Sequence, residues 1–232
     1  MPFFPEHQRL HRVFGLVSYS PILFIERDLE KVKALAVDLV RGAKTFRIDA
    51  SRSDKSFPLT SPEINVAVGD YVVEHTNAKV QLKQPDIHVG VEVHPMQMGV
   101  YTDVIPCFGG LPVGSGGKVI LLVENELSIL AGLLCMKRGL YLIPISVHQE
   151  RDISLLQSFA PFPLRQIVVE QMEDVEQIAR EHQCSSLISG QLLGEYVLYD
   201  IPLVVFRPLV GYTPSDVERE LEAYRAASFP HT

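Results

Sequence analysis

The stretch Val119-Ile120-Leu121-Leu122-Val123 is an unbroken apolar run, and a second strand is expected over residues 141–147, after a helical pattern over 126–138. Continuous apolar runs are typical of strands that are buried on both faces. Two of them joined by a helix indicate a parallel pair with a crossover. The alternation continues with helices expected over 153–159, 175–182 and 214–226, and with strands expected over 166–169, 186–189 and 203–206. The sequence therefore predicts an α/β domain with a doubly wound parallel sheet that is covered on both faces.

The first 110 residues alternate in a different way. A short helix is expected over 6–13 and a strand over 16–25, and Asp28 then caps an amphipathic helix that Gly42 stops. After a strand over 45–50, Ser61 as N-cap and Pro62 at the first helical position predict a second helix. Three further strands are expected over 79–82, 88–94 and 98–102. This order predicts a small α/β unit whose helices pack on one face of its sheet.

Glycine and proline are concentrated between the two patterns, over residues 105–118. The part from Gly109 to Lys118 invites comparison with a Walker A loop, which needs a glycine separated by four residues from its Gly-Lys pair, and then Ser or Thr and a helix. Pro112 occupies that glycine position, and Lys118 opens a strand instead. We interpret the segment as a flexible hinge between a domain over 1–110 and a domain over 111–232.

The bulk composition is that of a globular protein, because 47% of the 232 residues are hydrophobic and 21% are charged. The N-terminus shows no basic segment followed by an apolar core, and Glu124, Asn125 and Glu126 interrupt the longest apolar region. Neither a signal peptide nor a membrane span is predicted. We expect a cytoplasmic protein that does not associate with a membrane.

The three cysteines, Cys107, Cys135 and Cys184, are widely spaced and form no Cys-x-x-Cys pair. Free thiols in a reducing compartment and no zinc site are therefore expected. Cys135 falls within an apolar helical pattern, which favours a buried and inert thiol.

Charge is distributed unevenly along the chain. Residues 1–117 carry 12 Lys/Arg and 13 Asp/Glu, whereas residues 118–232 carry 9 and 15. A phosphate-rich partner would meet the first half more readily than the second. The net charge of −7 argues against a dedicated nucleic-acid binder of high affinity.

Several short motifs occur in a fixed order along the chain. They are Thr45-Phe46-Arg47, Asp-Lys-Ser-Phe-Pro-Leu-Thr-Ser-Pro-Glu-Ile-Asn at 54–65, Val-Gln-Leu-Lys-Gln-Pro-Asp at 80–86, Gly-Gly-Leu-Pro-Val-Gly at 109–114, Cys-Met-Lys-Arg-Gly at 135–139, Ser189-Gly190-Gln191 and Phe-Arg-Pro-Leu-Val-Gly at 206–211. In sequence, order and spacing, this set resembles the tRNA 4-thiouridine sulfurtransferase family. The resemblance is almost continuous from about Leu10 to Gly139.

The resemblance implies an RNA-binding THUMP-like domain over 1–110, with a remnant of a ferredoxin-like N-terminal part. It implies that residues 111–232 form a shortened adenylation domain of the PP-loop, Rossmann-like type. In that family the THUMP domain, with a ferredoxin-like domain before it, holds the acceptor end of tRNA. The second domain uses ATP and magnesium to adenylate a uridine, which persulfide sulfur then thiolates. Related enzymes also serve thiamine synthesis.

The nucleotide loop departs from the family. The family motif Ser-Gly-Gly-x-Asp-Ser, whose glycine amides cradle pyrophosphate at a helix N-terminus, corresponds here to Val123-Glu124-Asn125-Glu126-Leu127-Ser128. Only the final serine is kept, so side chains and two carboxylates stand where phosphates would lie. We interpret the segment as a plain helix start, with Asn125 as N-cap and Glu126 at the positive end of the helix dipole. The sequence thus predicts a degenerate PP-loop, with no cofactor, since ATP and magnesium are expected only of an active enzyme.

Other parts of the family pattern are not found in the sequence. The Gln- and Ser-rich segment that contacts ATP is missing after residues 189–194, and no sulfur-accepting cysteine or rhodanese-like domain follows. By comparison with the family, we also expect most of the ferredoxin-like half before Leu10 to be lacking. We therefore assign none of the family's catalytic residues to this chain.

RNA contacts in the family's THUMP domain are implied on the strand that matches residues 46–55. Asp49 and Ser51 stand where basic residues are common in the family. The candidate RNA-binding residues are Lys44, Arg47, Arg52, Lys55 and Lys83. A solvated strand edge is the alternative interpretation of Arg47, Arg52 and Lys55, and three phosphate contacts would give only a modest, salt-sensitive affinity.

Two further groups of ionisable residues were weighed as sites. His88, Glu92 and His94 share one face of a predicted strand, but a solvent-facing side opposite buried valines explains them without a metal. Residues 148–152 follow the C-terminal end of a predicted parallel strand, where ligands of such sheets bind. Any remaining pocket is expected there, although ordinary loop polarity is the favoured interpretation of His148, Glu150 and Asp152.

Three functions remain open from the sequence. The first is a non-catalytic tRNA-binding relative of the thiolation enzyme, and the second is an active or partner-assisted tRNA sulfurtransferase in 4-thiouridine or thiamine sulfur transfer. The third is an oligomeric interaction protein that has lost both ligands. The missing glycines favour the first, so tRNA is the expected partner, with a protein partner or a homo-oligomer as further expectations.

Overall fold

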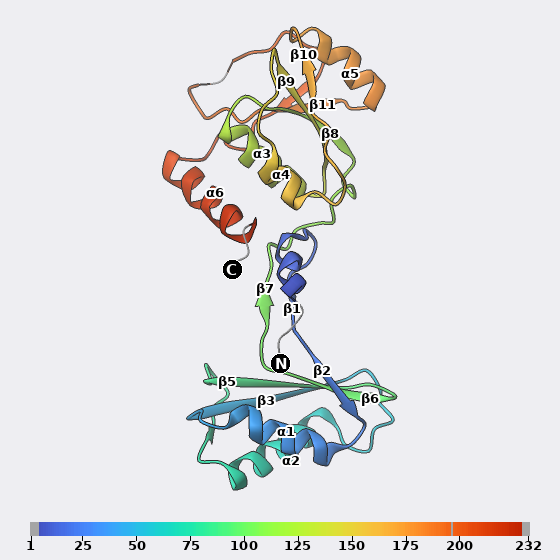
Figure 1. The fold of residues 1–232 in the computed structure, drawn as a ribbon, viewed down its shortest axis with the longest axis vertical. Helices are drawn as coiled ribbons and strands as arrows, with labels where there is room; N and C mark the ends of the chain where they lie inside the picture. The colour runs from blue at the N-terminus through green and yellow to red at the C-terminus, as the bar shows by residue number, and fades with distance from the viewer. Residues whose placement is uncertain (1–4, 196, 229–232) are drawn as a thin grey trace. The chain divides into compact units, whose positions relative to one another are not determined.

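The computed structural model describes residues 5–195 and 197–228, and the chain divides into two compact units (Figure 1). The smaller unit is Tyr19–Ile105, and the larger unit is Met1–Ser18 together with Pro106–Thr232. The division expected from the sequence was 1–110 and 111–232. The difference at the N-terminus has a packing reason, because the Phe14 ring stacks on Phe159 with centroids 5.3 Å apart.

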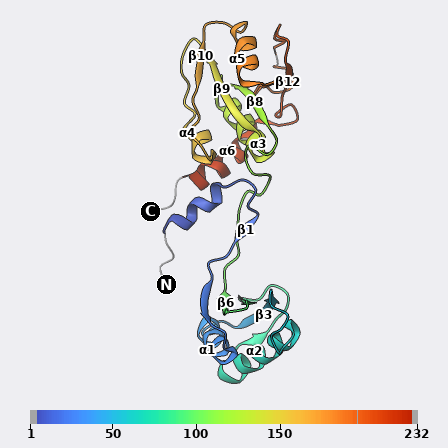
Figure 2. The same cartoon turned by 90° about the vertical axis from the view of Figure 1, so that its right-hand side faces the viewer.

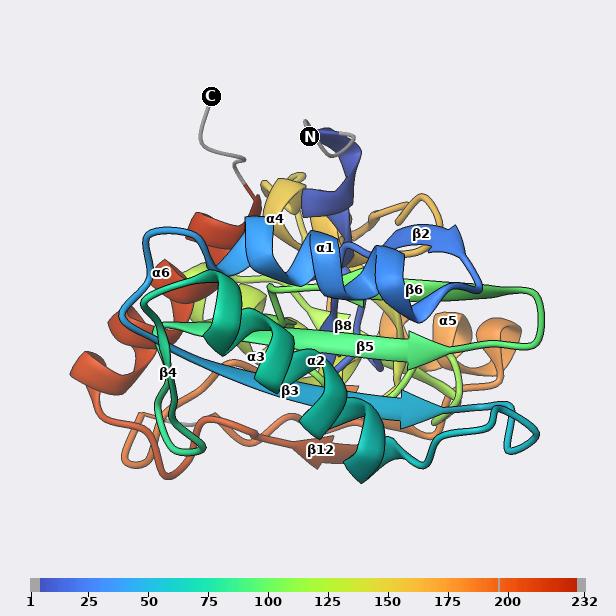
Figure 3. The same ribbon diagram turned by 90° about the horizontal axis from the view of Figure 1, so that it is seen from below.

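The smaller unit is one five-stranded mixed sheet with two helices. Its strands are β2 (Leu23–Glu26), β3 (Thr45–Arg52), β4 (Lys79–Val80), β5 (Ile87–Val93) and β6 (Gln97–Tyr101), in the order β2-β6-β5-β3-β4. Strand β3 runs parallel to β4 and β5, whereas β6 is antiparallel to β5 and β2. Helices α1 (Leu29–Val40) and α2 (Ser61–His75) lie on the same face of this sheet, as predicted (Figures 2 and 3).

Local sequence explains how these elements begin and end. Asp28 caps α1 as predicted, since its carboxylate accepts a hydrogen bond of 2.9 Å from the Glu30 amide. The N-cap of α2 is Thr60, so the assignment of Ser61 was wrong. Thr60 and Glu63 form a reciprocal capping box, in which the Thr60 amide donates to the Glu63 carboxylate at 2.7 Å. The strand expected over 16–25 is two short strands, β1 (Ser18–Tyr19) and β2, and β1 pairs with β7 (Ile105–Pro106).

The larger unit is a five-stranded, fully parallel sheet. Its strands are β8 (Lys118–Leu122), β9 (Tyr141–Val147), β10 (Ile167–Val169), β11 (Ser186–Ile188) and β12 (Val204–Phe206), in the order β10-β9-β8-β11-β12. Its helices are η1 (Pro5–Arg12), α3 (Glu126–Lys137), α4 (Ser154–Phe159), α5 (Asp174–His182) and α6 (Pro214–Ser228). The strand order reverses beside β8, as in doubly wound folds. The predicted fold class is confirmed.

Strand β8 is buried on both faces, which is why its sequence is apolar without interruption. Leu121 packs into a core with residues of α3, α4 and α6, whereas Ile120 and Leu122 pack into a second core with residues of α5. Figure 1 shows α5 on the opposite side of the sheet from α3 and α6. Among the described residues, none of the helices combines the length and the apolar character that a membrane crossing requires.

The glycine-rich segment before β8 is fixed to the C-terminal end of α3. The Leu111 amide donates to the Lys137 carbonyl at 2.9 Å, and the Gly114 and Gly116 amides each donate to the Gly139 carbonyl at 2.8 Å. A Cβ atom on Gly110 would lie 2.2 Å from the Lys137 carbonyl oxygen. The prediction of a flexible hinge is therefore wrong for these residues, because their amides and their close backbone approach hold them in place.

Candidate functional site

The loop after β8 is closed by its own side chains. The side-chain oxygen of Asn125 accepts hydrogen bonds from the Leu127 amide at 2.9 Å and from the Ser128 amide at 3.3 Å. The Glu124 amide donates to the Ser128 hydroxyl at 3.1 Å. Asn125 is thus the N-cap of α3, as predicted. Three amides that could face a ligand at this helix start are already engaged.

The family resemblance implies ATP at this loop, and the residues present do not fit its phosphates. A phosphate cradle needs free amides and open space at the helix N-terminus. Here the amides are engaged, and partial desolvation raises the pKa of the Glu124 carboxyl, although the residue as a whole is exposed. The Glu126 carboxylate forms an ion pair with Arg225. From the other side the Gly190 backbone approaches so closely that a Cβ atom there would lie 2.3 Å from the Ser128 nitrogen.

A cavity of about 550 Å³ opens beside this loop. Its charged lining includes Glu124, Arg151, Asp152 and Arg225, and Ile129 and Leu155 are among the apolar residues that line it. The cavity lies at the C-terminal ends of β8 and β9, where a pocket was expected, but of the three candidates there Asp152 lines it, whereas His148 and Glu150 are outside its lining. Its charges are mixed, and the Asp152 carboxylate is occupied by the Ser154 amide at 2.8 Å, which lowers the Asp152 pKa.

A hydrogen-bonded chain connects the altered loop with the segments after β11 and β12. The Tyr199 hydroxyl donates to the Glu124 carboxylate at 3.5 Å, and the Gln191 side-chain amide donates to the Tyr199 oxygen. The Gln191 carbonyl accepts from the Arg207 Nε atom at 3.2 Å. Tyr199 was missed from the sequence, because no motif marks it and its contact with Glu124 spans 75 positions. Desolvation raises its pKa, so the hydroxyl keeps its proton at neutral pH.

Two of the five candidate RNA-binding residues are engaged inside the smaller unit. The Arg47 guanidinium pairs with Asp49 at 2.7 Å. The Arg52 guanidinium donates to the backbone carbonyls of Leu59 at 2.8 Å and Phe57 at 3.3 Å, and so supports the loop before α2. Both side chains therefore contribute to the structure of the smaller unit through these contacts.

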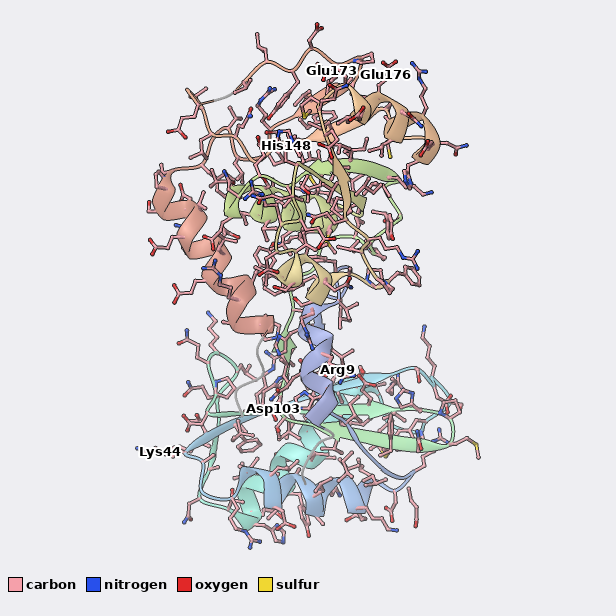
Figure 4. All side chains as sticks on the ribbon, turned by 45° about the horizontal axis from the view of Figure 1, so that its top comes forward. Arg9, Lys44, Asp103, His148, Glu173 and Glu176 are labelled. Atoms are coloured by element: carbon pink, nitrogen blue, oxygen red, sulfur yellow. The ribbon has the colours of Figure 1, made fainter. Side chains whose placement is uncertain are left out.

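The other three candidates, Lys44, Lys55 and Lys83, have exposed side chains that form no ion pair or side-chain hydrogen bond within the described residues. Lys44 lies where β3 begins, as Figure 4 shows, and its carbonyl accepts from the Lys79 amide at 2.9 Å. Lys83 follows β4, where its carbonyl accepts from the Gln81 side chain at 2.8 Å. We call Lys44, Lys79 and Lys83 the lysine cluster. Lys55 lies apart from it, beyond the other end of β3.

Lys79 was not predicted as an RNA-binding residue, although its place at the start of an expected strand could have indicated that it lies beside Lys44. It opens the short strand that pairs with the start of β3, where Thr45 and Lys79 are register partners. Nearby, the Asp86 carboxylate accepts from the Lys44 and Thr45 amides at 3.0 and 2.9 Å, and its hydrogen bonds, chiefly with Thr45, lower its pKa. The acid closest to the lysine cluster is thus used to hold the backbone.

The histidines of β5 and its end contact carboxylates singly. His94 lies 3.1 Å from Glu92, and His88 lies 3.6 Å from Asp49. The valines that alternate with them are buried, which confirms the predicted pattern of the strand. Within the described ranges, no three His, Cys, Asp or Glu side chains are placed to hold a metal ion.

The cysteines lie in surroundings that keep them protonated. Cys135 is buried as predicted, and desolvation raises its pKa to about 12. Desolvation also raises the pKa of Cys107 and Cys184. A thiolate nucleophile at neutral pH is disfavoured at all three positions.

Fold and sequence together place the chain among known proteins. The sequence profile of the THUMP domain matches residues 26–103, which lie within the smaller unit. The probable tRNA sulfurtransferase of Moorella thermoacetica is 30% identical over 262 aligned positions, which cover 90% of this chain and 66% of that protein. The chain belongs to the tRNA sulfurtransferase family. It covers between 34% and 71% of the length of the relatives compared.

Solved structures show the same two-part fold. The crystal structure of PH1313 from Pyrococcus horikoshii Ot3 superposes with a TM-score of 0.82 at 30% identity, over 94% of this chain and 80% of that one. A 4-thiouridine synthetase solved as an RNA complex with bound ATP also gives a TM-score of 0.82, at 24% identity, over all of this chain and 75% of that one.

Proposed function

We propose that this chain is a tRNA-binding member of the tRNA sulfurtransferase family that does not itself bind ATP or adenylate tRNA. The observation that carries the proposal is the closed start of α3. Asn125 caps the Leu127 and Ser128 amides, and Ser128 caps the Glu124 amide. The amides that a phosphate would need are hydrogen-bonded to side chains of the same loop.

The RNA part of the proposal rests on the THUMP match and on the lysine cluster. The cluster presents three exposed cations that form no ion pair within the described residues, with Asp86 as a carboxylate near Lys44. Three phosphate contacts supply a modest and salt-dependent affinity. Relatives of this chain are described as probable tRNA sulfurtransferases, and one structural neighbour was solved with RNA. Transfer RNA is therefore the partner that we assign to the smaller unit.

The state of the thiols speaks against an independent sulfur-transfer activity. Sulfur transfer through a cysteine requires a thiolate, and its accessibility sets its reactivity. Burial raises the pKa of Cys135 to about 12, and Cys107 and Cys184 are raised in the same direction. An enzyme that receives its nucleotide site and its thiol from a partner chain would show activity only with that partner.

The test is tRNA binding by fluorescence anisotropy across a salt series, with ATP binding by calorimetry on the same preparation. We expect tRNA binding that weakens as salt rises, and no heat from ATP and magnesium. Micromolar ATP binding would overturn the assignment of the closed loop. An absence of tRNA binding even at low salt would overturn the RNA assignment.

A further inference from the structure

A large groove lies on the larger unit, away from the altered nucleotide loop. Its volume is about 1310 Å³. Elements distant in sequence form its lining, including the glycine-rich segment, the start of β8, the end of α3, the segment around β12 and α6. We call it the basic groove, after its cations Lys118, Lys137, Arg138 and Arg207.

The groove concentrates positive charge on an otherwise acidic part of the chain. Four of the nine Lys/Arg after residue 117 line it, together with a single acid, Glu220, although this part of the chain carries 15 acids. Arg180, Arg219 and Arg225, outside the lining, each form an ion pair. In the described parts of the chain, Lys118, Lys137 and Arg138 form none. Such a cluster creates a local positive potential that attracts polyanions.

Stabilisation of α3 does not account for this arrangement. Basic residues in the last turn of a helix offset its dipole, which would explain Lys137 and Arg138 by themselves. Lys118 opens a strand and Arg207 follows another one, so neither belongs to that helix end. The four cations share the groove rather than an element.

Apolar and aromatic residues line the groove together with these cations. Phe206 at the end of β12 is 53% exposed, and Leu111 in the glycine-rich segment is 52% exposed. Tyr212 also lines the groove, and desolvation raises its pKa, so its ring stays neutral. Exposed aromatic rings beside cations are the pattern on which unpaired bases stack while the backbone meets positive charge.

Two sides of the groove are fixed before any ligand binds. The Leu111 amide is bonded to the Lys137 carbonyl at 2.9 Å. The Arg207 guanidinium is held by the Gln191 side chain at 3.2 Å and by the Val197 carbonyl at 2.7 Å. A fixed lining reduces the ordering cost of binding.

We infer that the basic groove binds a single-stranded segment of RNA, with phosphates at the cations and bases on Phe206 and Tyr212. The volume exceeds the range of about 300–1,000 Å³ that is usual for small-molecule pockets, which favours a segment of polymer. The inference deepens the proposed function, since it rests on RNA being the partner, and it adds a second contact surface to the one on the smaller unit.

The first test uses the full chain and a fluorescein-labelled oligouridine of about eight nucleotides. The variant Lys118→Gln/Lys137→Gln/Arg138→Gln removes three cations of the groove, and Arg165→Gln removes an exposed arginine outside its lining. We expect about tenfold weaker binding for the triple variant, and a salt slope that falls by about 2, because each contact to a single strand contributes about 0.7. The control should bind as the unaltered chain does. Equal binding by both variants overturns the inference.

A second measurement locates the bases directly. Oligouridine that carries 5-iodouridine forms ultraviolet crosslinks to aromatic rings in contact with the base. We expect crosslinks to Phe206 or Tyr212, and Phe206→Leu, which keeps an apolar side chain at β12, should lose any crosslink to position 206. Crosslinks confined to residues 19–105 would overturn the inference.

The two proposals fail in distinguishable ways. If tRNA does not bind the chain at all, the proposed function fails, whatever the oligouridine does. If tRNA binds and the triple variant behaves like Arg165→Gln, the groove inference fails alone. Self-association that the triple variant abolishes, measured by light scattering, would make the groove an interface between two copies and would also overturn it.

Discussion

The Tyr199 hydroxyl lies 3.5 Å from the Glu124 carboxylate, although 75 positions separate the two residues. Glu124 stands in the loop where the family resemblance implies a phosphate site, and Tyr199 lies in the connection between β11 and β12. The parallel sheet brings them together, because β11 is the neighbour of β8. The contact holds the Glu124 carboxyl group within the loop that begins α3.

Glu124→Gln should stabilise the protein at neutral pH and leave it unchanged at low pH. Desolvation raises the pKa of Glu124 above its ordinary value of 4.5, so the folded state disfavours the ionised form. Below pH 4.5 the carboxyl is protonated in both states, and the penalty develops as the pH rises toward and beyond the folded pKa. We expect the melting temperature near pH 7 to rise by about 1–2 °C, since a half-exposed group is partly solvated. Glu150→Gln, in the nearby loop, is the control, and a gain that appears only below pH 4.5 would contradict the prediction.

Asn125→Ala should destabilise the larger unit, because it removes the acceptor for the Leu127 and Ser128 amides. Loss of a helix N-cap costs about 1 kcal/mol. Urea denaturation measures the loss. Asn125→Asp keeps the acceptor and should retain the stability. Equal losses in the two variants would show that the cap hydrogen bonds do not account for the contribution of Asn125 to stability.

Gly110→Ala should cost more stability than Gly114→Ala. Both glycines have positive φ angles, +85° and +95°, which cost an alanine about 1 kcal/mol. At Gly110 the new methyl group would also lie 2.2 Å from the Lys137 carbonyl oxygen, whereas at Gly114 nothing lies within 4 Å. The difference between the two variants in urea denaturation therefore isolates the close approach. Equal losses would mean that the glycine-rich segment is not held on α3.

Replacement of the lysine cluster should weaken tRNA binding and flatten its salt dependence. Lys44→Gln/Lys79→Gln/Lys83→Gln removes three exposed cations. The slope of log affinity against log salt should fall by about 2–3, with binding at least about tenfold weaker at about 0.15 M salt. Arg41→Gln, an exposed arginine at the end of α1 that pairs with Asp38, is the matched control. An unchanged slope in the triple variant would remove the cluster from the interface.

The features that the sequence predicted are those with local causes. The apolar run of β8, the caps Asp28 and Asn125 and the buried Cys135 each depend on neighbours within a few residues, so the residue pattern was enough. The cap of α2 was predicted one residue late, because Ser61 before Pro62 also fits an N-cap, whereas the capping box joins Thr60 to Glu63.

The features that the sequence missed depend on contacts across the fold. From the sequence, Gly110 was predicted to be part of a hinge, because its close approach to the Lys137 carbonyl is visible only in the fold. From the sequence, Arg52 was predicted to be available to RNA, whereas in the structure it donates a hydrogen bond to the Leu59 carbonyl. The basic groove joins residues from Lys118 to Arg207, and no spacing in the sequence connects them.

The closed loop after β8 also limits how the protein can be redesigned. Substitution of Asn125 by glycine would free two amides, yet the Glu124 carboxyl, held by Tyr199, and the Glu126–Arg225 pair would still oppose a phosphate. Asn125→Gly alone loses the helix cap, and Glu124→Gln alone gains stability but leaves the amides engaged, so no single change opens this loop for a phosphate. A version of this chain that binds phosphate at the first turn of α3 therefore requires substitutions at several positions together.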